Sequence, residues 1–258
     1  MPLPVYMAMT EAEFRGCSEL PEYSGWMACH FSPYGKGLSN IPEILPPDSL
    51  LIVNDRTPPQ GHDPDYIAAQ LLEAVDKLSV FGVLMDFQRP DQQEISDIAH
   101  AIGKALPCPV IVTHHYANAC QGPVLLPPLP PNKSLTEHLA PWKGKELWLE
   151  LSLEGIALTL TENGCKAESC EHSPIPCPLQ DEALHCHYGI ALQEKSAMFY
   201  LHRTDEDILR LLEQAETMGV KAAVGLYQEL EACSICPQRR IDSDRPQYKE
   251  AGYGKHLS

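Results

Sequence analysis

The chain has 258 residues, enough for one large domain with a full core, and a net charge of −16 from 35 acids against 19 bases. That charge repels phosphate backbones and no cluster of basic residues offsets it, so we expect no nucleic-acid partner. No apolar run approaches the roughly 18 residues of a membrane span, and the start of the chain lacks the pattern of a signal peptide. These features predict a cytoplasmic protein without membrane contact.

The first part of the chain predicts strands with irregular connections. A short apolar run at 5–9 is a candidate first strand, and 10–22 is a short helix or a loop. Residues 25–31 predict a better strand, followed at 32–49 by a loop rich in Gly, Ser, Pro and Asn. The run at 50–53 is a third strand.

From residue 50 the sequence alternates between strand and helix. Asp63 is placed to cap a helix that begins with proline, and the strand at 81–85 follows that helix. Asp91 and Glu94 have the spacing of a capping box at the start of the next helix, which leads to a strand at 109–113. Strands that alternate with helices predict parallel pairing and right-handed crossovers.

The regular alternation of strand and helix ends beyond residue 120. A sixth strand is expected at 123–126, and 146–151 and 156–160 together predict a hairpin with period-2 alternation. A second hairpin joins 188–193 to 198–202. We therefore expect a small antiparallel insertion at about 146–202.

The end of the chain returns to the α/β pattern. Thr204 is placed to cap a helix with an acidic first turn, and Gly219 ends that helix. The last barrel strand is expected at 222–227. The complete prediction is a (β/α)8 TIM-type barrel with irregular connections, forming one domain over 1–236, with a loosely ordered tail at 237–258.

The stretch Phe81–Pro90 resembles the signature strand of the chitinase-like glycoside hydrolases, which reads Asp-Gly-(apolar)-Asp-(apolar)-Asp-(aromatic)-Glu-Tyr-Pro. The positions that fit are Gly82, Val83, Met85, Asp86, Phe87 and Pro90. Phe81 and Leu84 replace the first two acids, and Gln88 stands where the family has its catalytic Glu. The closing segment also resembles the family's, with Tyr227 at the place of a Trp on the floor of the sugar site.

The resemblance implies a degenerate site. In the family the Glu protonates the glycosidic oxygen, and the Asp two residues earlier, here Asp86, steadies the acetamido group of the substrate. Gln88 has no such proton to give, so we expect a carbohydrate-binding protein that does not hydrolyse chitin-type substrates. Two alternatives stay open: a hydrolase of a small cytosolic glycoside or ester that uses Asp55, Glu150 or Glu229, and a structural or interaction barrel without a small-molecule ligand.

Polar residues follow several of the predicted parallel strands and should meet at one rim of the barrel, where a concave mouth makes a ligand site. Asp86 is the catalytic candidate if the protein is an enzyme, and Tyr227 or Trp148 could offer a flat face to a sugar ring. The ligand-binding candidates are Asn54, Asp55, Gln88, His114, His115, Tyr227 and Glu229. The alternative for any of them is that it caps a helix or bonds a neighbouring loop.

The ten cysteines are spread along the chain, so we expect mostly free thiols. Cys233 and Cys236 have metal-ligand spacing, but no second pair of this spacing accompanies them, which makes them weak metal candidates. No phosphate loop or dinucleotide fingerprint occurs, so no cofactor is expected. The sequence leaves the oligomeric state open.

Overall fold

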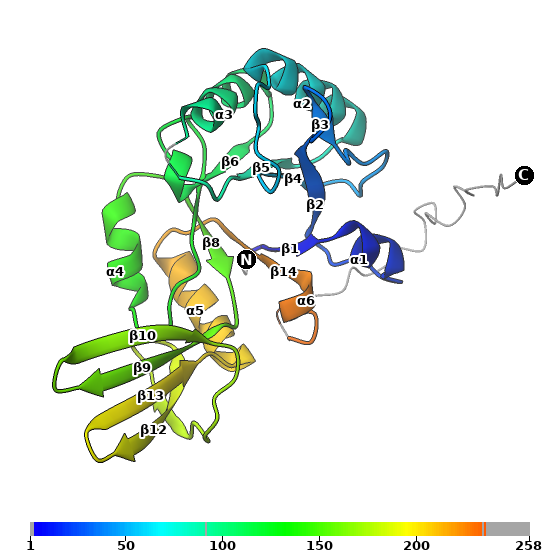
Figure 1. The fold of residues 1–258 in the computed structure, drawn as a ribbon. Helices are drawn as coiled ribbons and strands as arrows, with labels where there is room; N and C mark the ends of the chain where they lie inside the picture. The colour runs from blue at the N-terminus through cyan, green and yellow to red at the C-terminus, as the bar shows by residue number, and fades with distance from the viewer. Residues whose placement is uncertain (1–2, 91, 234, 236–258) are drawn as a thin grey trace, which may run out of the picture.

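A computed structural model describes residues 3–90, 92–233 and 235. Within them, eight parallel strands close into a barrel, because the first strand pairs with both the last and the second (Figure 1). In order around the barrel the strands are β1 (Val5–Met9), β14 (Ala222–Leu226), β8 (Leu147–Leu151), β7 (Val124–Leu126), β6 (Val110–Thr113), β5 (Gly82–Asp86), β4 (Leu50–Asn54) and β2 (Ser24–Phe31). The predicted TIM-type barrel is confirmed.

The helices around the barrel differ in length, which agrees with the predicted irregular connections. They are α1 (Glu11–Gly16), α2 (Pro64–Leu78), α3 (Gln93–Ala105), α4 (Leu135–Leu139), α5 (Asp205–Thr217), α6 (Tyr227–Leu230) and the 3-10 turns η1 (His114–Tyr116) and η2 (Ala140–Trp142). Between β2 and β4 the described chain has the short antiparallel strand β3 (Leu38–Ser39) in place of a helix. The result is an irregular barrel.

Two predicted caps are confirmed, at the starts of α2 and α5. Asp63 accepts from the backbone of α2, and Thr204 forms a capping box with Asp207 at the start of α5. The capping box expected at the start of α3 is wrong, because the N-cap residue of that helix is Gln92, one residue later than predicted. Glu94 instead accepts a hydrogen bond from the backbone N–H of Gly61, 2.7 Å away, and so fastens the loop after β4.

The barrel strands are apolar on both faces because each lies between two cores. One cluster of buried side chains fills the barrel interior, and the larger one lies between the barrel and its helices. The interior cluster consists of Tyr6, Ala8, Leu50, Ile52, Leu84, Ile111, Leu125, Trp148, Ala222 and Val224. Successive side chains of a strand point to opposite faces, so interior residues recur at every second position.

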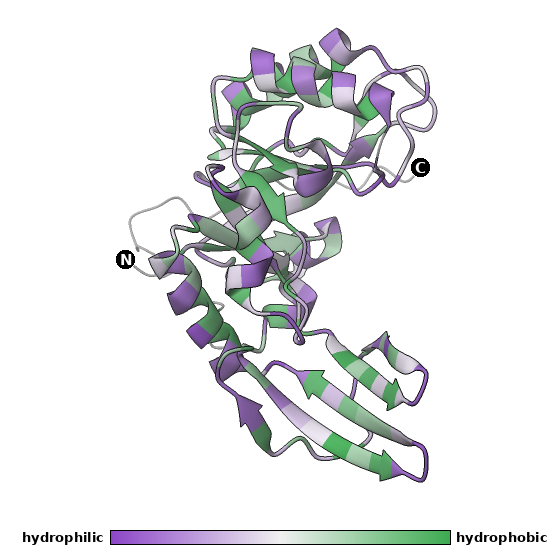
Figure 2. Cartoon of the chain, turned by 90° about the vertical axis from the view of Figure 1, so that its left-hand side faces the viewer, coloured by the Kyte–Doolittle hydropathy of each residue, from purple (hydrophilic) through white to green (hydrophobic). Residues whose placement is uncertain are grey.

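The predicted antiparallel insertion is a second sheet, which extends away from the barrel beyond α5 (Figures 1 and 2). As described, its strands in spatial order are β10 (Gly164–Cys170), β9 (Gly155–Thr161), β13 (Ser196–His202), β12 (Cys186–Gln193) and β11 (Leu179–Asp181). The expected hairpin of 188–193 with 198–202 is confirmed as β12 and β13. The expected hairpin of 146–151 with 156–160 is wrong: β8 is a barrel strand, and β9 pairs with β10 and β13.

Arg203, at the end of β13, ties the insertion to the barrel. Its buried guanidinium donates to the backbone carbonyls of Leu129 and Pro130 in the proline-rich loop after β7, and to those of Leu184 and His185 before β12. Burial lowers the pKa of Arg203 to about 10. One side chain therefore satisfies four carbonyl groups from two loops.

Arg203→Ala is expected to lower the free energy of unfolding by about 3 kcal/mol, because buried carbonyls lose their donor. Urea unfolding of the full chain measures the change. Arg210→Ala is the matched control, since Arg210 lies on α5 with its ion pair to Glu206 exposed, and it should cost less than about 1 kcal/mol. Equal losses for the two variants would contradict a tethering role for Arg203.

No helix in the part of the chain that the structure describes is both long and apolar enough to cross a membrane. The tail predicted at 237–258 lies outside the described residues, as does Cys236.

Candidate functional site

The carboxyl ends of the barrel strands bring three polar side chains to the mouth of the interior. Asn54 and Asp86 are register partners at the ends of β4 and β5. Each lies two positions after an interior residue, and so does Glu150 on β8, which follows Trp148. By the alternation of strand side chains, these three point into the top of the barrel interior. This rim is where barrel enzymes place their chemistry.

Asp86 and Gln88 form a bonded pair at the end of β5. The side-chain amide of Gln88 donates to Oδ1 of Asp86 over 2.5 Å. Phe87, between them, points the other way and is buried, with its ring centroid 5.6 Å from that of Phe31 and 6.1 Å from that of Tyr116. Packing of Phe87 into the outer core thus holds both polar neighbours toward the mouth.

Two carboxyl groups of the mouth, Glu150 and Asp86, have raised pKa values. Burial raises the pKa of Glu150 to about 7, and the nearby charges of Asp86 and Glu229 add to the rise. Burial also raises the pKa of Asp86, the hydrogen bond from Gln88 opposes that rise, and the charge of Asp55 adds to it. Near neutral pH the mouth therefore holds a carboxyl group, Glu150, that can either give or take a proton.

Asn54 uses its side chain on the backbone of the barrel. Its Nδ2 donates to the carbonyls of Met27 and Cys29, at 2.9 and 3.0 Å, where the pairing of β2 with β4 shifts register. Its Oδ1 accepts from the backbone N–H of Arg56 at 3.2 Å. Asn54 therefore stabilises an irregularity in β2, which is the alternative that the sequence left open for it.

Asp55 has a similar role at the next loop. It is buried, and its two carboxylate oxygens accept from the backbone N–H groups of Gln88 and Arg89 at 3.1 and 2.9 Å. Thr113 supports the same turn by donating its hydroxyl to the carbonyl of Phe87 at 2.6 Å. Together they fix the segment that carries the Asp86–Gln88 pair.

His114 and His115 lie side by side in η1, directly after β6, with ring centroids 3.9 Å apart and ring planes tilted by 38°. Burial lowers the pKa of His114, and the neighbouring His115 and His138 lower it further. His115 is exposed. A neutral imidazole at the end of β6 can donate or accept a hydrogen bond but adds no charge to the acidic mouth.

Tyr227 and Glu229 lie on α6, after the last barrel strand. The hydroxyl of Tyr227 is 3.5 Å from Sγ of Cys17, and Oε2 of Glu229 accepts from the backbone N–H of Leu153 at 3.2 Å. Trp148 is not at the rim: it is buried inside the barrel and stacks on Tyr6, with centroids 5.3 Å apart. The expectation that Trp148 could offer a face to a sugar is wrong, which leaves Tyr227 as the aromatic candidate.

Metal binding gains no support from the described residues, among which no three His, Cys, Asp or Glu side chains are grouped to hold an ion. Cys233 is buried, and its predicted partner Cys236 falls outside them. The cysteine pair stays a prediction.

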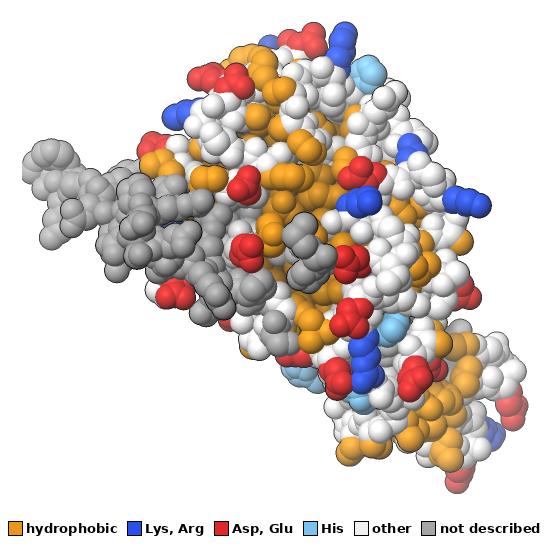
Figure 3. All heavy atoms as spheres, turned by 180° about the vertical axis from the view of Figure 1, so that it is seen from behind, with side chains coloured by type: hydrophobic (Ala, Val, Ile, Leu, Met, Phe, Trp, Pro, Cys, Tyr) orange, Lys and Arg blue, Asp and Glu red, His pale blue; other side chains and the backbone are white. Residues whose placement is uncertain are grey.

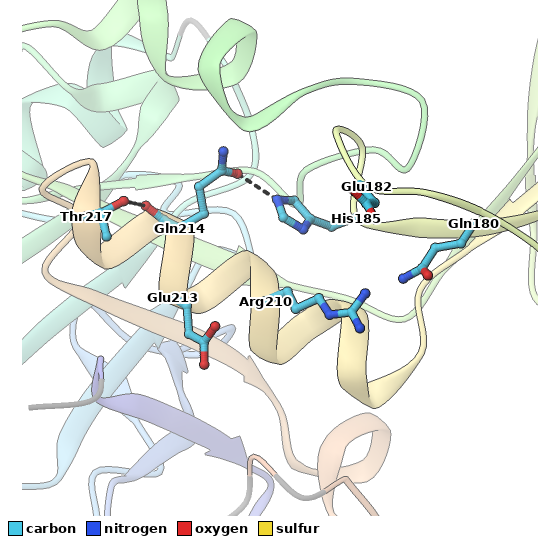
Figure 4. A pocket seen from close by; sticks show the side chains of 7 residues that line it. All are labelled: Gln180, Glu182, His185, Arg210, Glu213, Gln214 and Thr217. Carbon is cyan, nitrogen blue, oxygen red and sulfur yellow. Dashed lines mark hydrogen bonds between the residues drawn. The ribbon is translucent and has the colours of Figure 1, made fainter.

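Two open hollows lie away from the mouth. One, of about 480 Å³, runs between α5 and the insertion, where Nε2 of His185 lies 2.7 Å from Oε1 of Gln214 (Figure 4). It is lined by Gln180, Glu182, His185, Arg210, Glu213, Gln214 and Thr217. The other, of about 500 Å³, lies at the tips of the two hairpins of the insertion. The residues that line them are polar or charged, and both hollows are open to solvent, unlike the apolar enclosure of most small-molecule sites.

No protein-family model and no curated protein matches the sequence. Solved structures do match in fold. The spore cortex-lytic enzyme SleL of Bacillus cereus superposes with a TM-score of 0.58 at 10% identity, covering 86% of this chain and 70% of that one. A class V chitinase from Nicotiana tobaccum gives 0.56 at 9% identity, covering 87% and 93%. A glycoside hydrolase family 18 N-acetylglucosaminidase from Paenibacillus barengoltzii gives 0.55 at 9%, covering 86% and 94%. The chain therefore has the fold of the chitinase-like barrels.

Proposed function

We propose that the barrel mouth binds a sugar-like ligand and does not carry out chitinase-type hydrolysis. The observation that carries this proposal is the Asp86–Gln88 pair, in which an amide is hydrogen-bonded to the aspartate at the place where the resembling strand has its acid. An amide offers a donor and an acceptor to sugar hydroxyls but has no proton to transfer. The site can then hold a glycoside without protonating its leaving group.

The residues around this pair suit a carbohydrate. A sugar ring has C–H groups on its faces and hydroxyls at its edge, so it fits an aromatic face beside carboxyl and amide groups. Asp86 and Glu150 supply the carboxyl groups from β5 and β8. Tyr227, on α6 and packed against the cluster outside the barrel, is the aromatic candidate. A glutamate-to-glutamine mutant of the Nicotiana tobaccum chitinase is known in complex with NAG4, so in that protein an acid-to-amide change is compatible with a bound sugar oligomer.

The test is isothermal titration calorimetry of the full chain with NAG4. Wild type should bind, and Asp86→Ala and Tyr227→Ala should each weaken binding at least about tenfold, the effect of losing roughly 1.4 kcal/mol of contacts. Gln193→Ala, on a hairpin of the insertion, is the control and should bind as wild type does. Absence of heat with NAG4 and with a panel of other oligosaccharides would favour a barrel without a small-molecule ligand.

A second function is favoured by one observation, the pKa of about 7 at Glu150. A carboxyl group that is half protonated at neutral pH can act as a general acid, so the mouth could hydrolyse a small glycoside or ester with Glu150 in that role. A screen of aryl glycosides and aryl esters separates the two functions. Turnover that falls as pH rises through about 7 and is lost in Glu150→Gln would establish hydrolysis in place of simple binding.

A further inference from the structure

One face of the insertion sheet consists of apolar side chains from its three central strands. The face is made by Leu158 and Leu160 of β9, Ile190 and Leu192 of β12, and Ala197 and Phe199 of β13. The strand register places them in two rows across the sheet, three side chains to a row. We refer to these six residues as the apolar face.

The apolar face is not part of the described core. None of its six side chains belongs to, or packs against, either cluster of buried residues in the described chain. Leu192 is 81% exposed, Ile190 43% and Leu160 42%. Figure 3 shows hydrophobic side chains gathered on this part of the molecule, at the lower right. Monomeric proteins seldom leave so continuous a set of large apolar side chains in water.

The opposite face of the same sheet is covered around Gly189. The loop before β11 crosses it, so that a side chain at Gly189 would meet Pro176 and Cys177. At one end, His187 is bonded to the buried Asp207 of α5, with Nδ1 and Oδ2 2.7 Å apart. The sheet is therefore fastened to its own chain on one side and open on the apolar side.

We propose that the apolar face is a homodimer interface, in which two copies of the chain pack their insertion sheets face to face across a two-fold axis. Sheets pack closely when their twists match, and two copies of one sheet have the same twist and the same outline. A two-fold axis also makes the contact close on itself, so the interface needs one patch per chain.

The size of the sheet fits such a contact. Strands lie about 4.8 Å apart and rise about 3.4 Å per residue, so each residue covers roughly 16 Å² of the sheet. The five strands have three to eight residues each and together a projected area of roughly 500 Å², and the pleated side chains add to it. A stable interface buries about 800 Å² per partner, which is of the same order.

The charge distribution favours this face over the rest of the surface for self-association. With a net charge of −16, two copies repel each other across most approaches. The six positions of the apolar face include no acid or base, and the charged residues of the neighbouring strand β10, Lys166 and Glu168, are in register with Thr159 and Ala157, which point to the opposite face. The six positions themselves therefore bring no like charges together.

Sedimentation velocity of the full chain, from about 1 to 100 μM, tests the proposal. Wild type should sediment as a dimer, at twice the 28.6 kDa of the chain, and the dimer should tighten as salt screens the remaining repulsion. Leu192→Asp puts two carboxylates into the interface and should raise the dimer dissociation constant on the order of 100-fold. Leu192 is a surface residue, so the variant should keep its fold, which circular dichroism checks.

Gln193→Asp is the matched control, because it adds the same charge at the next position of β12, on the opposite face. It should leave the dissociation constant within about threefold of wild type. A wild-type chain that stays monomeric at 100 μM would overturn the proposal. So would equal weakening by Leu192→Asp and Gln193→Asp, since that result would place the contact elsewhere.

Discussion

Gln88→Glu is expected to give the barrel mouth hydrolytic activity toward NAG4, by a factor on the order of 10²–10⁴ over the wild-type chain. The new carboxyl group would stand where the amide of Gln88 now lies 2.5 Å from Oδ1 of Asp86, so the two groups would share a proton. The neighbouring negative charges of Asp86 and Glu150 would raise the pKa of the new group, as the charge of Asp86 raises that of Glu150, and keep it protonated closer to neutral pH. A protonated carboxyl group held toward a glycosidic oxygen is what the wild-type pair lacks.

Product analysis after incubation of each variant with NAG4 measures the gain, and calorimetry with NAG4 measures binding separately. The double variant Gln88→Glu with Asp86→Asn is the control, because it supplies the acid without its bonded aspartate and should lose most of the gain. A Gln88→Glu variant that binds NAG4 and leaves it intact would show that more than the acid is missing. A variant that neither binds nor cleaves would contradict the ligand proposed for the mouth.

All eight barrel strands could be predicted from the sequence, but the pairing partners of one of them, Leu147–Leu151, could not. Leu147–Leu151 has the apolar run of a strand buried on both faces. Because another strand follows it directly in the sequence, the sequence predicts a hairpin between the two. Its actual partners are β7, the strand before it in the chain, and β14, which lies beyond the whole insertion. Gly164–Cys170 was missed because it is an edge strand, exposed along most of its length, whose apolar residues are only Ala and Cys.

The position of the candidate site could be predicted from the sequence, but the roles of its residues only in part. The run that ends in Asp86 places polar residues at the end of a barrel strand, which the structure reproduces. Whether Asn54 and Asp55 face a ligand or the backbone depends on the irregularity of β2 and on the turn after β5, neither of which is local to those residues. The inward direction of Glu150 also depends on the barrel, because the apolar residues of β8 occupy both faces.

A large change in stability that depends on pH is expected at Glu150. Burial, assisted by Asp86 and Glu229, raises its pKa from the ordinary 4.5 to about 7. A carboxyl group whose pKa is raised by folding carries a cost in the folded state once it ionises. The cost is absent below pH 4.5, grows as the pH rises from there to 7, and is complete above 7. A difference of about 2.5 in pKa corresponds to about 3 kcal/mol.

Glu150→Gln should therefore raise the free energy of unfolding by about 3 kcal/mol at pH 9 and change it little at pH 4. Urea unfolding at both pH values measures the difference. Glu73→Gln, at an exposed position of α2, removes the same charge and should show no such dependence. An equal effect of Glu150→Gln at pH 4 and pH 9 would mean that the mouth does not raise the pKa of the Glu150 carboxyl group. In that case Glu150 would also lose its claim to act as the acid of a hydrolase, because a carboxyl group with an ordinary pKa is fully ionised at neutral pH.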